Sequence, residues 1–113
     1  MEQRIVLSLL HGNTIPFYVE SIGFNCNQEN LIRTQGYPFY HWLQTVKGAG
    51  EIYIDGRKYI AEPQSGILIS PHMPHSYESI SVQNWETVYL TFGGGMVKEI
   101  VDYIQIHSDA LYL

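Results

Sequence analysis

Short runs of β-branched and aromatic residues, separated by turn-forming residues, make up most of the chain. Runs of about four to eight such residues between clusters of Gly, Pro, Asn and Asp are typical of β-strands. Their number and spacing predict an all-β fold, either a sandwich or a barrel. The predicted strands are Arg4–Leu10, Pro16–Gly23, Tyr40–Val46, Gly50–Ile54, Arg57–Ala61, Ile67–Ser70 and Trp85–Phe92.

The clearest local signal is a hairpin centred on the Asp-Gly pair at positions 55–56. A two-residue type I′ turn requires positive φ at both central residues, and Asp-Gly adopts that conformation readily. We therefore expect Gly50–Ile54 and Arg57–Ala61 to pair as antiparallel neighbours. The Gly-Ala-Gly segment at 48–50 is expected to form a sharp bend or bulge just before them.

The pattern changes after three consecutive glycines at 93–95. Apolar residues then recur at the spacing of one helix face, which predicts an amphipathic helix. The Ser-Asp pair at 108–109 resembles the start of a second helix, so we expect the chain to be a fragment that stops where that helix begins. The apolar positions of the predicted helix are Val97, Ile100, Val101 and Ile104.

Composition and charge restrict the class of protein. The 113 residues, 45% of them hydrophobic, provide the core of one domain and exclude a disordered chain. Six Lys and Arg against 11 Asp and Glu give a net charge of −5, so this chain alone is a poor nucleic-acid binder. The lone cysteine, Cys26, excludes an internal disulfide. Because no membrane span or signal peptide is evident, we expect a soluble cytoplasmic domain without a membrane partner.

The last predicted strand alternates in character between its two faces. One face is aromatic and hydroxylic, which suits a pocket for a small polar molecule with an apolar side, a sugar being the plainest case. The alternative is that Trp85 and Tyr89 belong to the hydrophobic core and that the one polar group of each ring is hydrogen-bonded within the protein. The pocket face would carry Trp85, Thr87, Tyr89 and Thr91, and the other face Val88, Leu90 and Phe92.

Three histidines, His41, His72 and His75, lie at or near predicted strand ends. Imidazole binds Zn, Fe, Ni or Cu, but a metal centre requires three or four converging ligands. The chain has neither a nucleophile elbow nor a phosphate-binding glycine loop. We therefore expect no catalytic residue, metal or cofactor, and keep a metal-dependent enzyme built on these histidines as the alternative.

Six features follow one another in a fixed order between residues 33 and 92. They are Arg33, Tyr40-His41-Trp42-Leu43, Gly48-Ala49-Gly50, Ser65-Gly66-Ile67-Leu68-Ile69, Pro71-His72-Met73-Pro74-His75-Ser76-Tyr77 and Trp85…Tyr89…Phe92. In this order and spacing they resemble the N-terminal effector-binding domain of AraC-type transcriptional regulators.

The resemblance implies a cupin, or jelly-roll-like, barrel with a C-terminal amphipathic helix. Residues 1–95 would form the effector-binding barrel, and residues 96–113 the start of helices that pair two subunits. The family's helix-turn-helix domain is absent from this chain, so DNA is expected to be a partner only through that missing part. The segment Met1–His11 would be a mobile arm over the mouth of the barrel.

The resemblance also implies a set of ligand contacts. Arg33, His75, Tyr77 and Tyr89 match positions that touch the sugar in the arabinose sensor of the family, where a Trp stands in place of Tyr89. Two further residues, Trp85 and His41, are expected to contact the ligand in the same pocket.

The sequence thus predicts a domain that senses a small molecule, with a carbohydrate as the expected effector, and that forms a homodimer. It would belong to a transcription regulator and not be an enzyme. The alternatives are a metal-dependent cupin isomerase or dioxygenase, and a carbohydrate-binding or oligomerisation module without a signalling role.

Overall fold

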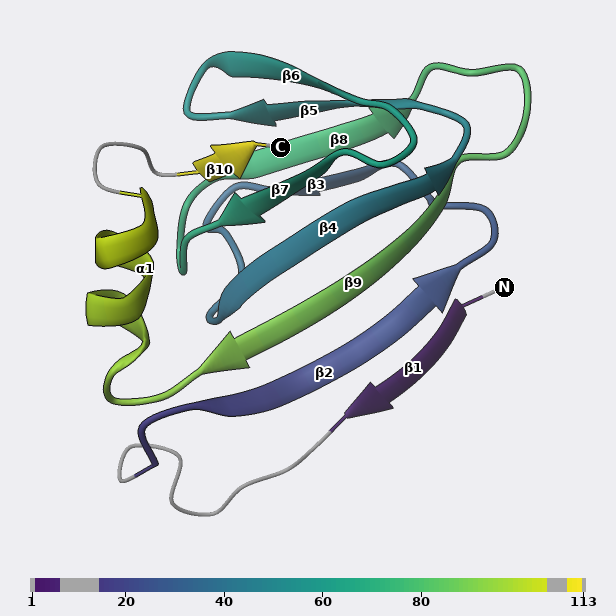
Figure 1. The fold of residues 1–113 in the computed structure, drawn as a ribbon. Helices are drawn as coiled ribbons and strands as arrows, with labels where there is room; N and C mark the ends of the chain where they lie inside the picture. Colours follow the sequence, from purple (N-terminus) through teal and green to yellow (C-terminus); the bar gives the residue numbers. More distant parts are fainter. Residues whose placement is uncertain (1, 7–14, 106–109, 113) are drawn as a thin grey trace.

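Two antiparallel sheets make up the fold in the computed structural model, which describes residues 2–6, 15–105 and 110–112 (Figure 1). The larger sheet contains, in spatial order, β1 (Glu2–Val6), β2 (Tyr18–Asn25), β9 (Glu86–Gly93), β4 (Tyr40–Lys47), β7 (Gly66–Ile69) and β10 (Ala110–Tyr112). The smaller sheet contains β3 (Leu31–Arg33), β8 (His75–Ser79), β5 (Gly50–Ile54) and β6 (Arg57–Ala61). A short helix, α1 (Val97–Gln105), follows β9.

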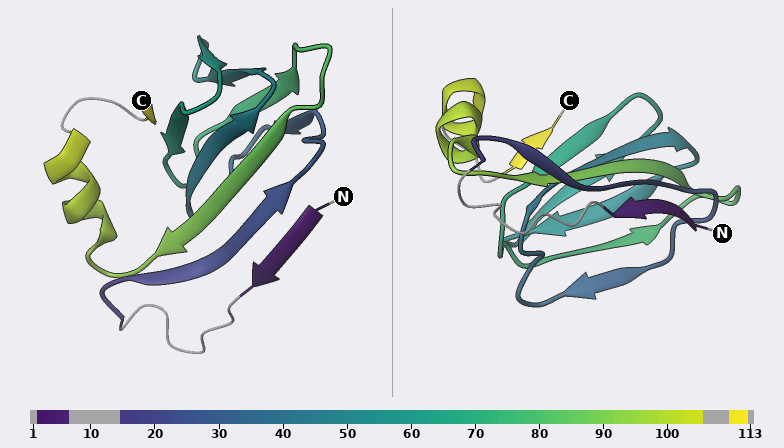
Figure 2. Two further views of the ribbon diagram at one scale, coloured as in Figure 1. Left: turned by 45° about the vertical axis from the view of Figure 1, so that its right-hand side comes forward. Right: turned by 90° about the horizontal axis from the view of Figure 1, so that it is seen from below.

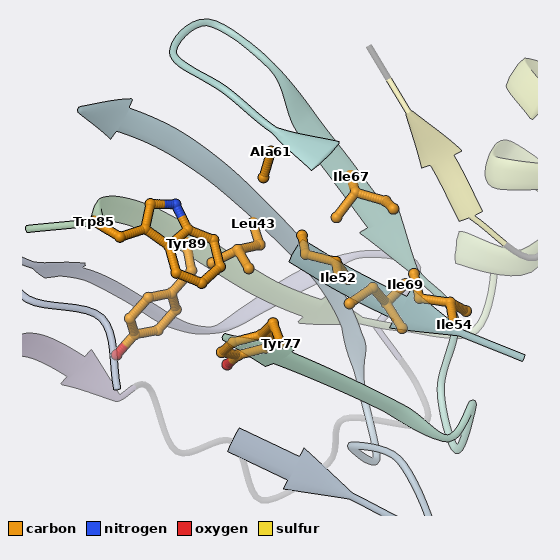
Figure 3. Close-up of a cluster of buried hydrophobic side chains, with 9 residues drawn as sticks. All are labelled: Leu43, Ile52, Ile54, Ala61, Ile67, Ile69, Tyr77, Trp85 and Tyr89. Atoms are coloured by element: carbon orange, nitrogen blue, oxygen red, sulfur yellow. The ribbon is translucent and has the colours of Figure 1, made fainter. Parts of the chain in front are cut away.

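The core lies between the two sheets, as the all-β prediction requires. β4, β7 and β9 supply its side chains from the larger sheet, and β5, β6 and β8 from the smaller one (Figure 3). Trp85 is fully buried, and its indole N–H donates to the Thr45 hydroxyl at 2.9 Å. The nine clustered residues are Leu43, Ile52, Ile54, Ala61, Ile67, Ile69, Tyr77, Trp85 and Tyr89.

The predicted hairpin is confirmed. Asp55 and Gly56 have φ of 49° and 79°, the positive values that a type I′ turn needs, and Ile54 pairs with Arg57 across it. The bend before β5 is also present, with Gly48 at φ 75°. The bend at Gly48 and the turn at Asp55-Gly56 therefore fix where β5 begins and where it ends.

Two strands that the pattern missed, β3 and β8, are essential to the smaller sheet. β3 has three residues, and β8 is the sequence His-Ser-Tyr-Glu-Ser, which lacks β-branched residues. Both form because β8 is hydrogen-bonded between β3 and β5. Residue 75 is consequently the first residue of a strand and not part of a turn. For the predicted strand at Arg4–Leu10, residues 7–10 lie outside the described part of the chain.

The predicted helix is present, but it presents a narrower apolar face than expected. Val97 and Val101 are buried, whereas Ile100 is 45% exposed, and the side chain of Ile104 lies outside the described residues. Figures 1 and 2 show α1 on the outside of the larger sheet. Its buried residues contact outward-facing side chains of that sheet, namely Tyr40, Trp42, Leu68 and Phe92.

Trp42 and Tyr40 cover the outer face of β4 beneath α1. One expectation from the sequence is corrected here. Residues 110–112, where a second helix was expected, form β10 and pair with β7; Ser108 and Asp109 lie outside the described residues. Within the described residues, no helix has the length and apolar character needed to cross a membrane.

Candidate functional site

A cavity of ≈ 270 Å³ lies at one end of the space between the sheets, next to β1. Its size suits a molecule no larger than a monosaccharide, because ligand pockets of about 300–1,000 Å³ hold drug-sized molecules. Four predicted ligand contacts line it: Arg33, His41, Tyr77 and Tyr89.

The other two predicted contacts, His75 and Trp85, are not among the residues that line the cavity. Trp85 lies behind it, with its ring edge-on to Tyr77 at 5.8 Å. His75 is buried beside Arg33. Figure 3 shows the rings of Tyr77 and Tyr89 directed to the same side of the core.

Arg33, His75 and Tyr77 form one hydrogen-bonded cluster across β3 and β8. The imidazole N–H at Nδ1 of His75 donates to the carbonyl of Met73 at 2.9 Å, so Nε2 is the acceptor. Arg33 Nη1 donates to that Nε2 at 3.0 Å and to the Tyr77 hydroxyl at 3.5 Å. Burial, together with the charge of Arg33, lowers the pKa of His75. The imidazole is therefore neutral and fixed in one tautomer.

His41 extends this cluster from the facing sheet. Its ring lies 6.3 Å from that of His75 and 6.0 Å from that of Tyr89. Only 4% of the residue is exposed, and its Nδ1 has no hydrogen-bond partner among the described residues. Burial, with the nearby Arg33 charge, lowers the pKa of His41 to about 3, so the imidazole is neutral at neutral pH.

The low pKa of His41 predicts a dependence of stability on pH. The unfolded state takes up a proton near pH 6.5, whereas the folded state takes it up only near pH 3, so the unfolded state binds more protons between these values. The free energy of unfolding is therefore unaffected by His41 above about pH 6.5, and it falls as the pH drops towards 3. The slope from this one group is at most about 1.4 kcal/mol per pH unit. Urea denaturation between pH 6.5 and 4.5 measures it.

His41→Phe should flatten this slope, because the buried titrating group is removed. His72→Ala is the matched control, since His72 is exposed. Equal slopes in the parent protein and in His41→Phe would contradict the assignment.

A polar network that sequence reasoning missed closes another side of the cavity. Glu20 accepts hydrogen bonds from the Tyr37 hydroxyl at 2.8 Å and the Thr91 hydroxyl at 2.7 Å. Arg4 donates to Tyr37 at 3.0 Å and lies 3.9 Å from Glu20. Burial raises the pKa of Glu20, but these hydrogen bonds and Arg4 outweigh it and lower the pKa overall. The strand pattern hid Glu20 because β2 is irregular between Val19 and Ser21, which breaks the alternation there.

The first strand, β1, brings two charged residues to the cavity. Glu2 accepts a hydrogen bond from the Tyr89 hydroxyl, and the guanidinium of Arg4 lies 5.8 Å from the centre of the Tyr89 ring. Burial and the Glu2 carboxylate raise the pKa of Tyr89, which keeps its hydroxyl a donor. Of the expected N-terminal arm, residues 2–6 are described and pair with β2 along their whole length.

The three histidines proposed as metal ligands do not converge. His72 is exposed, in a turn with φ of 61°, while His41 and His75 are buried. Across the described ranges, no three His, Cys, Asp or Glu side chains are grouped so that they would hold a metal ion. The described residues thus do not form the three-histidine centre that the alternative hypothesis requires.

Two facing antiparallel sheets around a polar cavity define a cupin-type barrel, and solved structures share this fold. A Cupin 2 conserved barrel domain protein from Salinispora arenicola matches with a TM-score of 0.61 and 14% identity, over 90% of this chain and 82% of its own. YhaK from Escherichia coli matches with a TM-score of 0.71 and 11% identity, over 100% of this chain and 50% of its own. ToxT from Vibrio cholerae matches with a TM-score of 0.59 and 16% identity, over 87% of this chain and 42% of its own. The chain thus spans half or less of two of these proteins.

The family model of the AraC-like ligand binding domain matches residues 17–111, which is most of the sequence, so the chain belongs to that family. No curated protein matches the chain. The resemblance that the sequence suggested is therefore confirmed for family and fold.

Proposed function

We propose that this chain binds a small polar molecule with an apolar side, a sugar being the simplest case, in the cavity beside β1. The observation that carries the proposal is the lining itself. Arg33 and the hydroxyls of Tyr77 and Tyr89 supply fixed polar groups, and the tyrosine rings supply flat apolar surface. Membership of a ligand-binding family supports the same function.

A binding role fits this site better than a catalytic one. The AraC-like ligand-binding domain is a regulatory domain. In this chain the two buried imidazoles are neutral, and that of His75 is already bonded at both nitrogens. A general base needs a free acceptor of sufficient basicity close to the reacting proton: His75 has no free nitrogen, and the pKa of about 3 makes His41 a weak base. The cluster is therefore suited to hold a ligand and not to move a proton.

Signalling would operate through elements that touch or adjoin the cavity. A ligand shifts a conformational equilibrium only by its difference in affinity between two states. β1 is suited to such a difference, because it lies at one edge of the larger sheet and still lines the cavity through Glu2 and Arg4. Ligand binding would thereby change how readily β1 leaves its place on β2.

The longer protein would be a dimeric transcription regulator, with this chain as its sensing and dimerisation part. Exposed apolar side chains on and beside α1, Met96, Ile100 and Tyr103, are the surface we assign to pairing two subunits. Contact with DNA would belong to a separate domain, which agrees with the charge of −5 on this chain.

A melting-temperature screen tests the binding proposal. The domain is heated alone and with each of a panel of neutral monosaccharides and polyols, which are the sizes that the cavity accommodates. A ligand present at about 100 times its dissociation constant stabilises the folded state by about 2.7 kcal/mol, which is roughly 10 °C for a domain of this size. A rise of this order with any member supports the proposal, and no rise with any of them contradicts a sugar or polyol as the effector.

A further inference from the structure

Arg33 is a partly buried cation without a counter-ion. Within the part of the chain that the structure describes, it forms no ion pair; its directed contacts are to His75 and Tyr77. Its guanidinium also lies 5.0 Å from the centre of the Tyr37 ring, a neutral partner. Arg4, the other arginine of the cavity, is paired with Glu20. The two cations of the site therefore differ: the charge of one is compensated and that of the other is not.

The histidines near Arg33 cannot compensate its charge. The Nδ1 proton of His75 is donated to Met73, so that ring accepts from Arg33 as a neutral imidazole. A guanidinium carries five N–H donors, and the two hydrogen bonds described here both start at Nη1. Donors thus remain for a further acceptor in the cavity that Arg33 lines. A planar carboxylate is the acceptor that matches the guanidinium best, because its two oxygens can accept from two parallel N–H groups at once.

The chain itself places two glutamates at the same cavity, Glu2 and Glu29. Glu2 lines it and accepts from the Tyr89 hydroxyl, so the lining already accommodates a carboxylate at its β1 side. Glu29 also lines the cavity, and because Glu2 and Glu29 are both exposed, solvent screens both charges. A ligand acid is thereby opposed only by screened carboxylates, of which Glu2, on the edge strand β1, is the one bonded to Tyr89.

We propose that the ligand of this cavity is a small hydroxylated acid, such as a sugar acid, whose carboxylate binds Arg33 while its hydroxyls meet Tyr77 and Tyr89. This inference rests on the proposed binding function and names the class of ligand. A neutral sugar leaves the charge of Arg33 without a partner, whereas a carboxylate forms a charge-assisted, two-point contact with it.

The experiment compares matched acids and neutral sugars by titration calorimetry on the domain. The pairs are D-glucuronate with D-glucose, D-galacturonate with D-galactose, and D-glycerate with glycerol. We expect at least one acid to bind about tenfold or more tightly than its neutral partner, because a hydrogen bond to a charged group contributes about that factor. Arg33→Gln should remove this preference, and Arg57→Gln, which makes the same charge change at the exposed first residue of β6, should keep it.

A second variant leaves Arg33 in place. Glu2→Gln removes the competing carboxylate, so it should tighten the binding of the acid several-fold and leave the neutral sugar unchanged. Equal affinity for acids and neutral sugars overturns this inference while the proposed function stands. Binding of D-glucose 6-phosphate without any of the acids also overturns it, because the anion is then a phosphate. If neither acids nor neutral sugars bind, both proposals fall.

Discussion

Replacing Trp85 with alanine is expected to lower the free energy of unfolding by about 3–5 kcal/mol. The side chain is fully buried, packs edge-on against Tyr77, and donates its indole N–H to Thr45. It also fills the space above Gly50, where a Cβ would lie 2.4 Å from the ring, and Gly50 has no side chain with which to fill the void. Total stabilities of small domains are about 5–15 kcal/mol, and the variant should be close to unfolding. Urea denaturation measures the loss.

Trp85→Phe separates the two contributions of this side chain. It keeps one aromatic ring but loses the rest of the indole and the hydrogen bond to Thr45, so we expect it to remain folded and to lose less stability than the alanine variant. Phe17→Ala is the surface control, because Phe17 is 48% exposed. A loss below about 1 kcal/mol for Trp85→Ala would show that the ring is not part of the core that supports the cavity.

Replacing both Arg33 and Tyr89 with alanine is expected to abolish ligand binding while the domain remains folded. These residues approach the cavity from opposite sheets, so the pair removes polar contacts from both of its walls. Hydrogen bonds to charged groups contribute about 1.5–3 kcal/mol and an aromatic stacking surface adds to this, so the combined loss in affinity should be about 100-fold or more. The measurement is the ligand-induced rise in melting temperature, for whichever ligand the screen identifies.

The control for this double variant carries the same changes on the outer surface. Arg57→Ala with Tyr53→Ala removes one arginine and one tyrosine that do not line the cavity. We expect its ligand-induced rise to equal that of the parent protein. Undiminished binding by the Arg33 and Tyr89 double variant would place the ligand elsewhere on the domain.

The parts of the fold that the sequence predicts are those set by local chemistry. The Asp55-Gly56 turn and the alternation along β9 depend on residues close together in the chain, and both are present in the structure. Thr87, Tyr89 and Thr91 are buried, and Val88 and Leu90 lie on the other face, as the alternation predicts. β3 and β8 have no such local pattern and form because β8 pairs with β3 on one side and with β5 on the other.

The candidate site is only partly visible in the sequence for the same reason. Arg33, His75 and Tyr77 were expected together, and the pairing of β3 with β8 brings them into one cluster. Glu2 was not expected, because its contact with Tyr89 spans 87 positions and depends on β1 pairing with β2. Contacts of this kind follow from the order of strands in a sheet, which no local pattern records.

The most direct test of the account is a crystal structure of the domain grown with the tightest ligand from the titrations. We predict ligand density in the cavity between the sheets, with one ligand oxygen within hydrogen-bonding distance of Arg33 and another near the Tyr89 hydroxyl. Ligand density on the outer face of either sheet, with the cavity filled by side chains of the protein, would contradict the account.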